Sequence, residues 1–131
     1  MKTILVDAVY CFIIEKGDTF QIYQDMHDLL EKYPNRKILL TGADDEGIKK
    51  YGFDDVPYEV FTLKHNPEKT DPAYYRKFLK AFNLDTENVV YFEHNPDAVK
   101  SAQSIGINTY YYDNDKKDLE GLKRFLDNNL K

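Results

Sequence analysis

The sequence predicts an α/β fold with three layers, in which a five-stranded parallel sheet carries helices on both faces. Short apolar runs rich in β-branched residues alternate with amphipathic helical patterns along the 131 residues. These runs are nearly continuous rather than alternating, which is typical of strands that are covered on both faces. No repeat, low-complexity tract or linker interrupts the pattern, so we expect residues 1–131 to form a single domain.

The first element is a strand that ends at Asp7, followed by a small hairpin whose turn is Lys16-Gly17-Asp18. Each later strand is a β-branched or aromatic run between two helical patterns. The expected strands are Ile4–Val6, Ile38–Leu40, Tyr58–Phe61, Val89–Phe92 and Asn108–Tyr112.

Apolar residues at helical spacing fill the intervals between these strands. One helix is opened by Asp71 as N-cap and Pro72 at the first helical position. Asn95-Pro96 repeats that opening, and Gly106 ends the helix that follows. The apolar stripes predict helices over 22–33 (stopped by Pro34), 44–51, 72–82, 96–105 and 119–126.

Composition excludes several classes of protein. The 18 basic and 23 acidic residues give a net charge of −5, which argues against binding to the phosphate backbone of nucleic acids. No uncharged run approaches the length of a membrane span, and no basic-then-apolar leader precedes the first strand. The single Cys11 excludes an internal disulfide and a multi-cysteine zinc cage, and we expect it to be an inert thiol. We therefore expect a cytoplasmic protein, either a monomer or a homo-oligomer.

Polar residues gather where the expected strands end. Asp7 ends the first strand, Thr41-Gly42 the second, and Glu93-His94-Asn95, with Asp97, the fourth, while Lys69 lies in the approach to a helix. Ligands of open α/β sheets bind beyond the carboxyl ends of the strands. A carboxylate can attack phosphorus there, and a hydroxyl and an ammonium can hold the charged oxygens, so the pattern indicates phosphoryl chemistry.

These motifs, taken in order, resemble the haloacid dehalogenase (HAD) superfamily, whose members are mostly phosphatases with a Rossmann-like fold. The resemblance spans nearly the whole chain and rests on Ile4–Asp7, Leu39–Gly42, Lys69–Tyr75 and Val89–Asp97, followed by Ala102 and Gly106. It implies that Asp7 is the nucleophile, that Thr41, Gly42 and Lys69 bind the phosphoryl group, and that Lys69 assists catalysis. It also implies Mg²⁺ as cofactor, with Asp7, Glu93, His94 and Asp97 as candidate ligands.

Two positions depart from the family pattern. Family phosphatases carry a second Asp two residues after the nucleophile, where it protonates the leaving group, but this chain has Val9. General acid–base help is typically worth ~10²–10⁴ in rate. His94 stands where the family has a metal-binding Asp, and an imidazole is a poor ligand for Mg²⁺.

The family selects substrates with inserted cap domains. Both segments that could hold a cap, Asp7 to Thr41 and Thr41 to Lys69, are already filled by the elements described above. We therefore expect no cap domain. By resemblance, capless members often act on large substrates or use a neighbouring subunit as the lid.

Three functions remain open. The first is a phosphohydrolase working through an aspartyl-phosphate on Asp7, with Glu15, Asp18 or His94 replacing the missing acid. The second is an inactive pseudoenzyme that serves as a binding or assembly module. The third is a dehalogenase, since that group also lacks the second Asp and begins its motif with Asp-Ala. We expect a small phosphorylated molecule or a protein as partner, and neither nucleic acid nor a membrane; Lys64 is an alternative to Lys69 as the site lysine.

Overall fold

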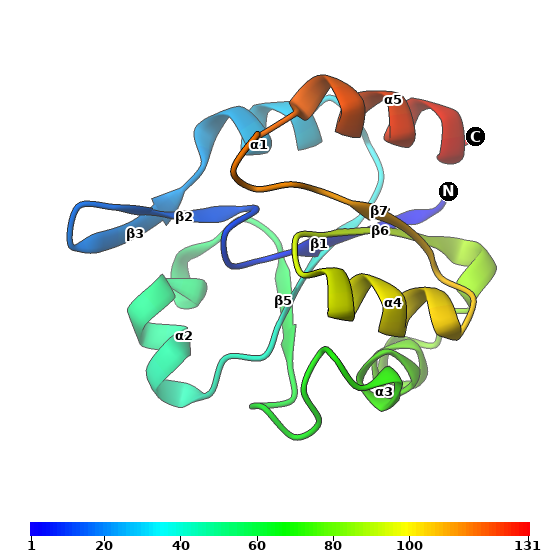
Figure 1. Cartoon of the computed structure of the whole chain (residues 1–131), viewed down its shortest axis with the longest axis horizontal. Coiled ribbons are helices and arrows are strands. Elements are labelled where there is room, and N and C mark those ends of the chain that lie inside the picture. Colours follow the sequence, from blue (N-terminus) through cyan, green and yellow to red (C-terminus); the bar gives the residue numbers. More distant parts are fainter.

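A computed structural model describes residues 1–131, and it confirms the three-layer α/β architecture with a parallel sheet (Figure 1). The five strands run in the order β5-β4-β1-β6-β7, and all four neighbouring pairs are parallel. The strands are β1 (Thr3–Asp7), β4 (Lys37–Thr41), β5 (Glu59–Thr62), β6 (Val89–Glu93) and β7 (Asn108–Tyr111).

The three central strands are buried along their whole length, which explains their continuous apolar sequences. Successive side chains of a strand point to opposite faces, so each strand contributes to two cores. Ile4 and Val6 of β1 belong to the core on one face, while Leu5 belongs to the core on the other.

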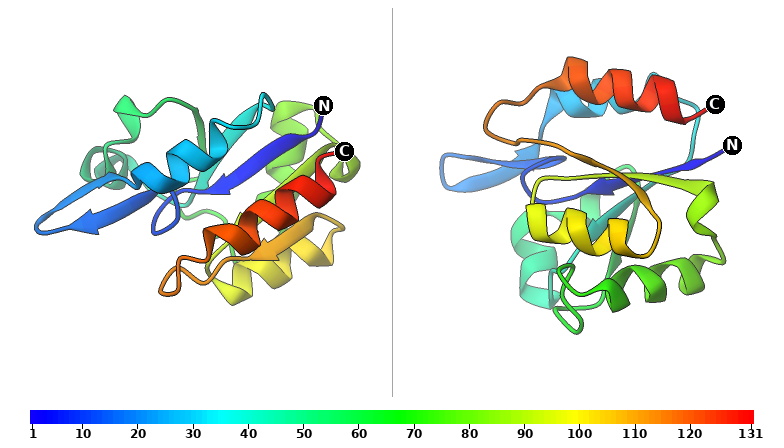
Figure 2. Two further views of the ribbon diagram at one scale, coloured as in Figure 1. Left: turned by 90° about the horizontal axis from the view of Figure 1, so that it is seen from above. Right: turned by 45° about the vertical axis from the view of Figure 1, so that its right-hand side comes forward.

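Two helices cover each face of the sheet, as the two views of Figure 2 show. On one face lie α1 (Gln24–Leu30) and α5 (Leu119–Asn129), and on the other α3 (Pro72–Phe82) and α4 (Pro96–Ser104). The short α2 (Asp45–Tyr51) follows β4, and two 3-10 turns lie at Phe53–Asp55 and Thr86–Asn88. No helix is both long enough and apolar enough to cross a membrane.

The helix caps match the sequence prediction. The side chain of Asp71 accepts a hydrogen bond from the backbone N–H of Ala73, and Asn95 accepts one from Asp97 in the same way. Each cap is followed by a proline in the first turn, where the missing N–H costs nothing. These caps fix the direction in which α3 and α4 leave the edge of the sheet that holds the polar strand ends.

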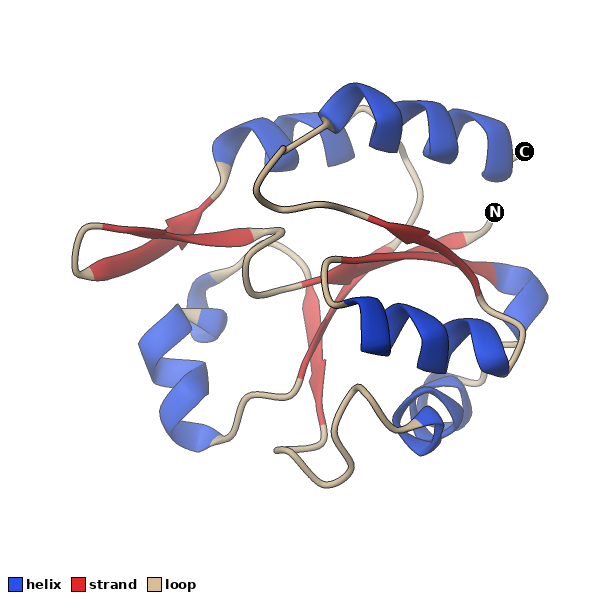
Figure 3. Cartoon of the chain, viewed as in Figure 1, coloured by secondary structure: helices blue, strands red, loops and turns tan.

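The expected hairpin is present as β2 (Ile13–Lys16) and β3 (Thr19–Ile22), and it projects from the body of the molecule (Figure 3). The prediction that the first helix begins at Ile22 was wrong. Ile22 pairs with Ile13 across the hairpin, and α1 begins only at Gln24. An apolar residue four positions before Met26 fits a helical stripe as well as a strand end, so spacing alone did not separate the two.

Candidate functional site

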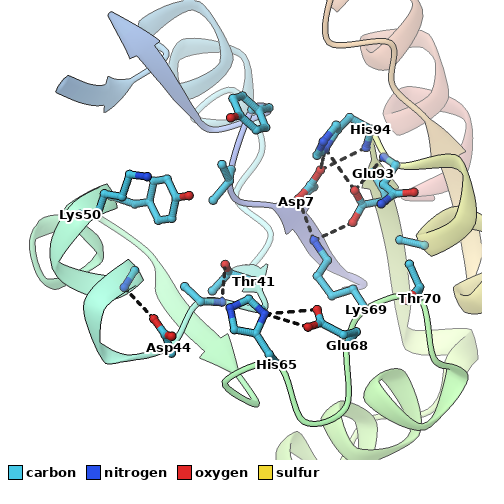
Figure 4. A pocket seen from close by; sticks show the side chains of 18 of the residues that line it. Asp7, Thr41, Asp44, Lys50, His65, Glu68, Lys69, Thr70, Glu93 and His94 are labelled. Carbon is cyan, nitrogen blue, oxygen red and sulfur yellow. Dashed lines mark hydrogen bonds and ion pairs between the residues drawn. The ribbon is translucent and has the colours of Figure 1, made fainter. Parts of the chain in front are cut away.

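A pocket of about 610 Å³ opens at the carboxyl edge of the sheet, and the polar strand ends form its floor (Figure 4). Asp7 ends β1, Thr41 ends β4 and Glu93 ends β6, and all three line this pocket. Because these strands are neighbours and parallel, their carboxyl ends lie at one edge. The structure therefore brings the predicted site residues of three separate segments together.

Lys69 contacts both buried carboxylates at the floor of the pocket. Its Nζ lies 2.7 Å from Asp7 Oδ1 and 2.6 Å from Glu93 Oε1. It also donates to the carbonyl oxygen of Leu40 at 3.2 Å, so the ammonium has three oxygen neighbours. The alternative, Lys64, pairs with Asp45 at 2.9 Å, and both of those side chains are exposed. The structure thus places Lys69, and not Lys64, beside Asp7.

The second carboxylate oxygen of Asp7 is also fully engaged. Asp7 Oδ2 accepts a hydrogen bond from the backbone N–H of His94 at 3.1 Å and contacts Nδ1 of the His94 ring. The thiol of Cys11 donates to the same oxygen at 3.3 Å. Asp7 therefore lies between an ammonium on one side and an imidazole on the other.

The electrostatics of the site follow from this arrangement. Burial of Asp7 opposes its ionisation, but the nearby Lys69 ammonium and the hydrogen bond from His94 outweigh it and hold the pKa of Asp7 well below its ordinary value. Burial likewise opposes protonation of His94, yet hydrogen bonds to Asp7 and Glu93 raise the pKa of His94 from 6.5 to about 10. The charges of two carboxylates and two cations thus cancel at the floor of the pocket, where the four side chains are largely buried.

Donors for an anion lie next to this cluster. Thr41 Oγ1 accepts a hydrogen bond from the backbone N–H of Ala43 at 3.2 Å, which leaves its hydroxyl proton free to donate. Val9 and Gly42 line the same pocket, and their backbone N–H groups donate to no other group of the chain. A hydroxyl and unpaired amides of this kind suit the oxygens of a phosphoryl group.

The expected ligands do not fit Mg²⁺. Asp97 is exposed on the first turn of α4 and does not line the pocket, although Asn95 and Ala98 on either side of it do. The metal-ligand role predicted for Asp97 is thus not supported by its position. The oxygens of Glu93 are taken by Lys69, by the Tyr91 hydroxyl and by the backbone N–H of Asn95. Mg²⁺ prefers an octahedron of oxygen ligands, and of the four expected ligands only Asp7 still offers a carboxylate oxygen in the pocket.

Of the three proposed substitutes for the missing acid, the structure places only one in the pocket. Val9 lines the pocket, so an apolar side chain occupies the position in question. Glu15 and Asp18 are exposed on the hairpin and do not line the pocket. His94 does line it, but its ring is engaged with Asp7.

Sequence reasoning missed several side chains of the pocket wall. Lys50 and Tyr51 come from α2, and the ammonium of Lys50 lies 5.5 Å from the centre of the Tyr51 ring. His65 and Glu68 form an exposed pair on the opposite wall. The contact of Cys11 with Asp7 was also missed, although Cys11 comes only four residues after Asp7. Nothing in the spacing showed that the chain turns back there.

Comparison with solved structures identifies the fold as HAD-like. A HAD-family enzyme from Bacteroides thetaiotaomicron, in complex with magnesium and inorganic phosphate, matches 85% of this chain and 93% of its own, with a TM-score of 0.68 and 13% identity. D,D-heptose 1,7-bisphosphate phosphatase from B. bronchiseptica, also with magnesium and phosphate, matches 92% of this chain and 87% of its own, with a TM-score of 0.68 and 14% identity.

A 2-haloacid dehalogenase from Pseudomonas syringae matches 72% of this chain but only 43% of its own, with a TM-score of 0.54 and 20% identity. No protein-family model and no curated protein sequence matches the chain. At these identities the comparisons establish a HAD-like fold and no more.

Proposed function

We propose that this chain is a phosphoryl-binding HAD-like domain that does not turn over phosphoesters. The observation that carries this proposal is the engagement of Asp7 on both oxygens, by Lys69 at Oδ1 and by the His94 amide and ring at Oδ2. A carboxylate held in this way, with a strongly lowered pKa, is a weak nucleophile towards phosphorus.

The pocket also lacks a donor for the proton that the leaving group needs. Hydrolysis of an ordinary phosphoester requires a proton for the departing oxygen, and Val9 cannot supply one. The His94 ring also lines the pocket, but its Nδ1 is engaged with Asp7. Without an acid and without a fitting Mg²⁺ site, the chemical step lacks two of its parts.

Binding of the ligand depends on different groups. The Thr41 hydroxyl and the amides of Val9 and Gly42 supply neutral donors that need not leave another partner. Because the four charged side chains of the floor balance one another, these donors carry the recognition of the oxygens. We propose a small phosphorylated molecule as ligand, because the pocket of about 610 Å³ has room for one.

Inorganic phosphate titrated by calorimetry tests the binding. We expect the wild-type protein to bind phosphate without added metal, and Thr41→Val to weaken binding by about tenfold through loss of one hydrogen bond to a charged group. Thr19→Val, on the exposed hairpin, is the matched control and should bind like the wild type. Equal affinity of Thr41→Val and wild type, or no phosphate binding at all, would contradict the proposal.

A second candidate function is phosphoester hydrolysis through an aspartyl-phosphate on Asp7. The position of Asp7 in the same pocket as the Thr41 hydroxyl favours it, because a phosphoryl group bound in that pocket would lie close to the carboxylate. An activated aryl phosphate with Mg²⁺ separates the two candidates. Turnover that disappears in Asp7→Asn supports hydrolysis, whereas absence of turnover in the wild type supports the binding domain.

A further inference from the structure

Three different metal-ligating side chains converge beside the pocket: Asp7 and His94, which line it, and the buried Cys11. Each offers one ligand atom, and these atoms all lie within 4.8 Å of one another. We propose that these three side chains form a site for a zinc-class transition-metal ion. The inference goes beyond phosphoryl binding: it shares Asp7 and His94 with the proposed function but uses none of the neutral donors that we assign to the phosphoryl group.

The donor set selects the class of metal. Carboxylate, thiolate and imidazole are the three side-chain ligands of Zn²⁺, whereas Mg²⁺ prefers oxygen throughout. Nitrogen and sulfur ligands favour Zn²⁺ and its transition-metal neighbours over Mg²⁺ and Ca²⁺. The same residues that do not fit magnesium therefore match a softer ion.

The distances are close to those that a tetrahedral ion requires. With bonds of about 2.0–2.3 Å, ligand atoms on one Zn²⁺ lie roughly 3.4–3.6 Å apart. Cys11 Sγ and Asp7 Oδ2 are 3.3 Å apart, which is already close to that range. His94 Nδ1 lies nearer to Asp7 Oδ2 and must move outward, and its side chain is 26% exposed towards the pocket, which leaves room for this movement.

The site keeps one position open. Three protein ligands leave a fourth tetrahedral position, as in zinc sites that bind water or substrate. Asp7 and His94 both line the pocket, so that position faces the space where an anion would bind. Backbone support comes from the His94 N–H, which already orients Asp7 Oδ2.

Titration of the metal-free, full-length protein with Co²⁺ tests the site. We expect one equivalent to bind with a near-ultraviolet thiolate-to-cobalt charge-transfer band, and one equivalent of Zn²⁺ to abolish that band. Mg²⁺ in large excess should have no effect. Absence of the band in the wild-type protein overturns the proposal directly, whatever the variants do.

Matched variants locate the ligands. We expect Cys11→Ser to lose the band and to weaken Zn²⁺ binding at least ~10-fold, and His94→Ala to weaken it comparably. His65→Ala removes the other histidine of the pocket and should leave binding unchanged. Equal affinity of Cys11→Ser and wild type would contradict the assignment. Thr41→Val should retain the cobalt band, so a failure of phosphate binding and a failure of metal binding are separate results.

Discussion

Four charged side chains at the floor of the pocket form a compact, balanced cluster. Asp7 and Glu93 are almost fully buried, with relative exposures of 2% and 1%, and Lys69 lies within hydrogen-bond distance of both. Removal of one partner of a buried pair is costly because it leaves an uncompensated charge. Lys69 therefore has a structural role in the cluster in addition to its place in the site.

Lys69→Met tests this role. The substitution keeps much of the side-chain volume but leaves two buried carboxylates without their shared cation, and we expect a loss of about 3–5 kcal/mol in the free energy of unfolding. Lys64→Met is the control, because its exposed pair with Asp45 is worth about 0–1 kcal/mol. Urea denaturation measures both. Similar losses for the two variants would show that Lys69 is not integral to the folded state.

The two helices on one face of the sheet are joined by polar contacts near their ends. The hydroxyl of Tyr33, just after α1, donates to Asp127 of α5 at 2.7 Å. Within α5, Lys123 donates to the other oxygen of Asp127 at 2.6 Å. The hydrogen bond from Lys123 and that from Tyr33 lower the pKa of Asp127 below its ordinary value.

A carboxyl group whose pKa is lower in the folded than in the unfolded chain stabilises the fold at pH values above its unfolded pKa, here 3.8. This contribution is lost as the pH falls through the pKa of the folded state. We therefore expect Asp127→Asn to destabilise the protein at pH 6 more than at pH 3. Denaturation midpoints at both pH values measure the difference. Asp115→Asn, at an exposed position of the loop before α5, is the matched control for the loss of one surface carboxylate. A constant difference between wild type and Asp127→Asn would contradict the expectation.

At the scale of the whole molecule, the sheet separates two hydrophobic cores. Leu126 of α5 belongs to the core shared with α1, and Ile107, which precedes β7, belongs to the core shared with α3. Both side chains are buried. Because the strands lie between the two cores, a change in one leaves the packing of the other intact.

Additivity tests this separation. We expect Leu126→Ala to cost about 2–5 kcal/mol and Ile107→Val about 0.5–1.5 kcal/mol of unfolding free energy. The double variant should lose the sum of the two within about 0.5 kcal/mol, as distant and independent sites do. Guanidinium denaturation of all four proteins gives the coupling. A coupling above about 1 kcal/mol would mean that the sheet transmits repacking from one face to the other.

Much of the fold could be predicted because its signals are local. All five strands of the sheet, the hairpin and the caps at Asp71 and Asn95 lie where the sequence pattern placed them. The start of α1 could not be predicted, because the pairing of Ile22 with Ile13 across the hairpin overrides a helical stripe. Asp97 could not be excluded either, because the direction of its side chain depends on how α4 leaves the strand.

The sequence by itself determined that Asp7, Thr41 and Glu93 would meet, since parallel neighbouring strands carry their last residues to one edge. Only the tertiary structure decided how those residues are used. The turn after β1 brings Cys11 back to Asp7, and the chain after β6 directs the His94 ring onto the same oxygen. These contacts depend on side-chain directions and on the path of loops, which are set by packing between distant segments and leave no periodic signal in the chain.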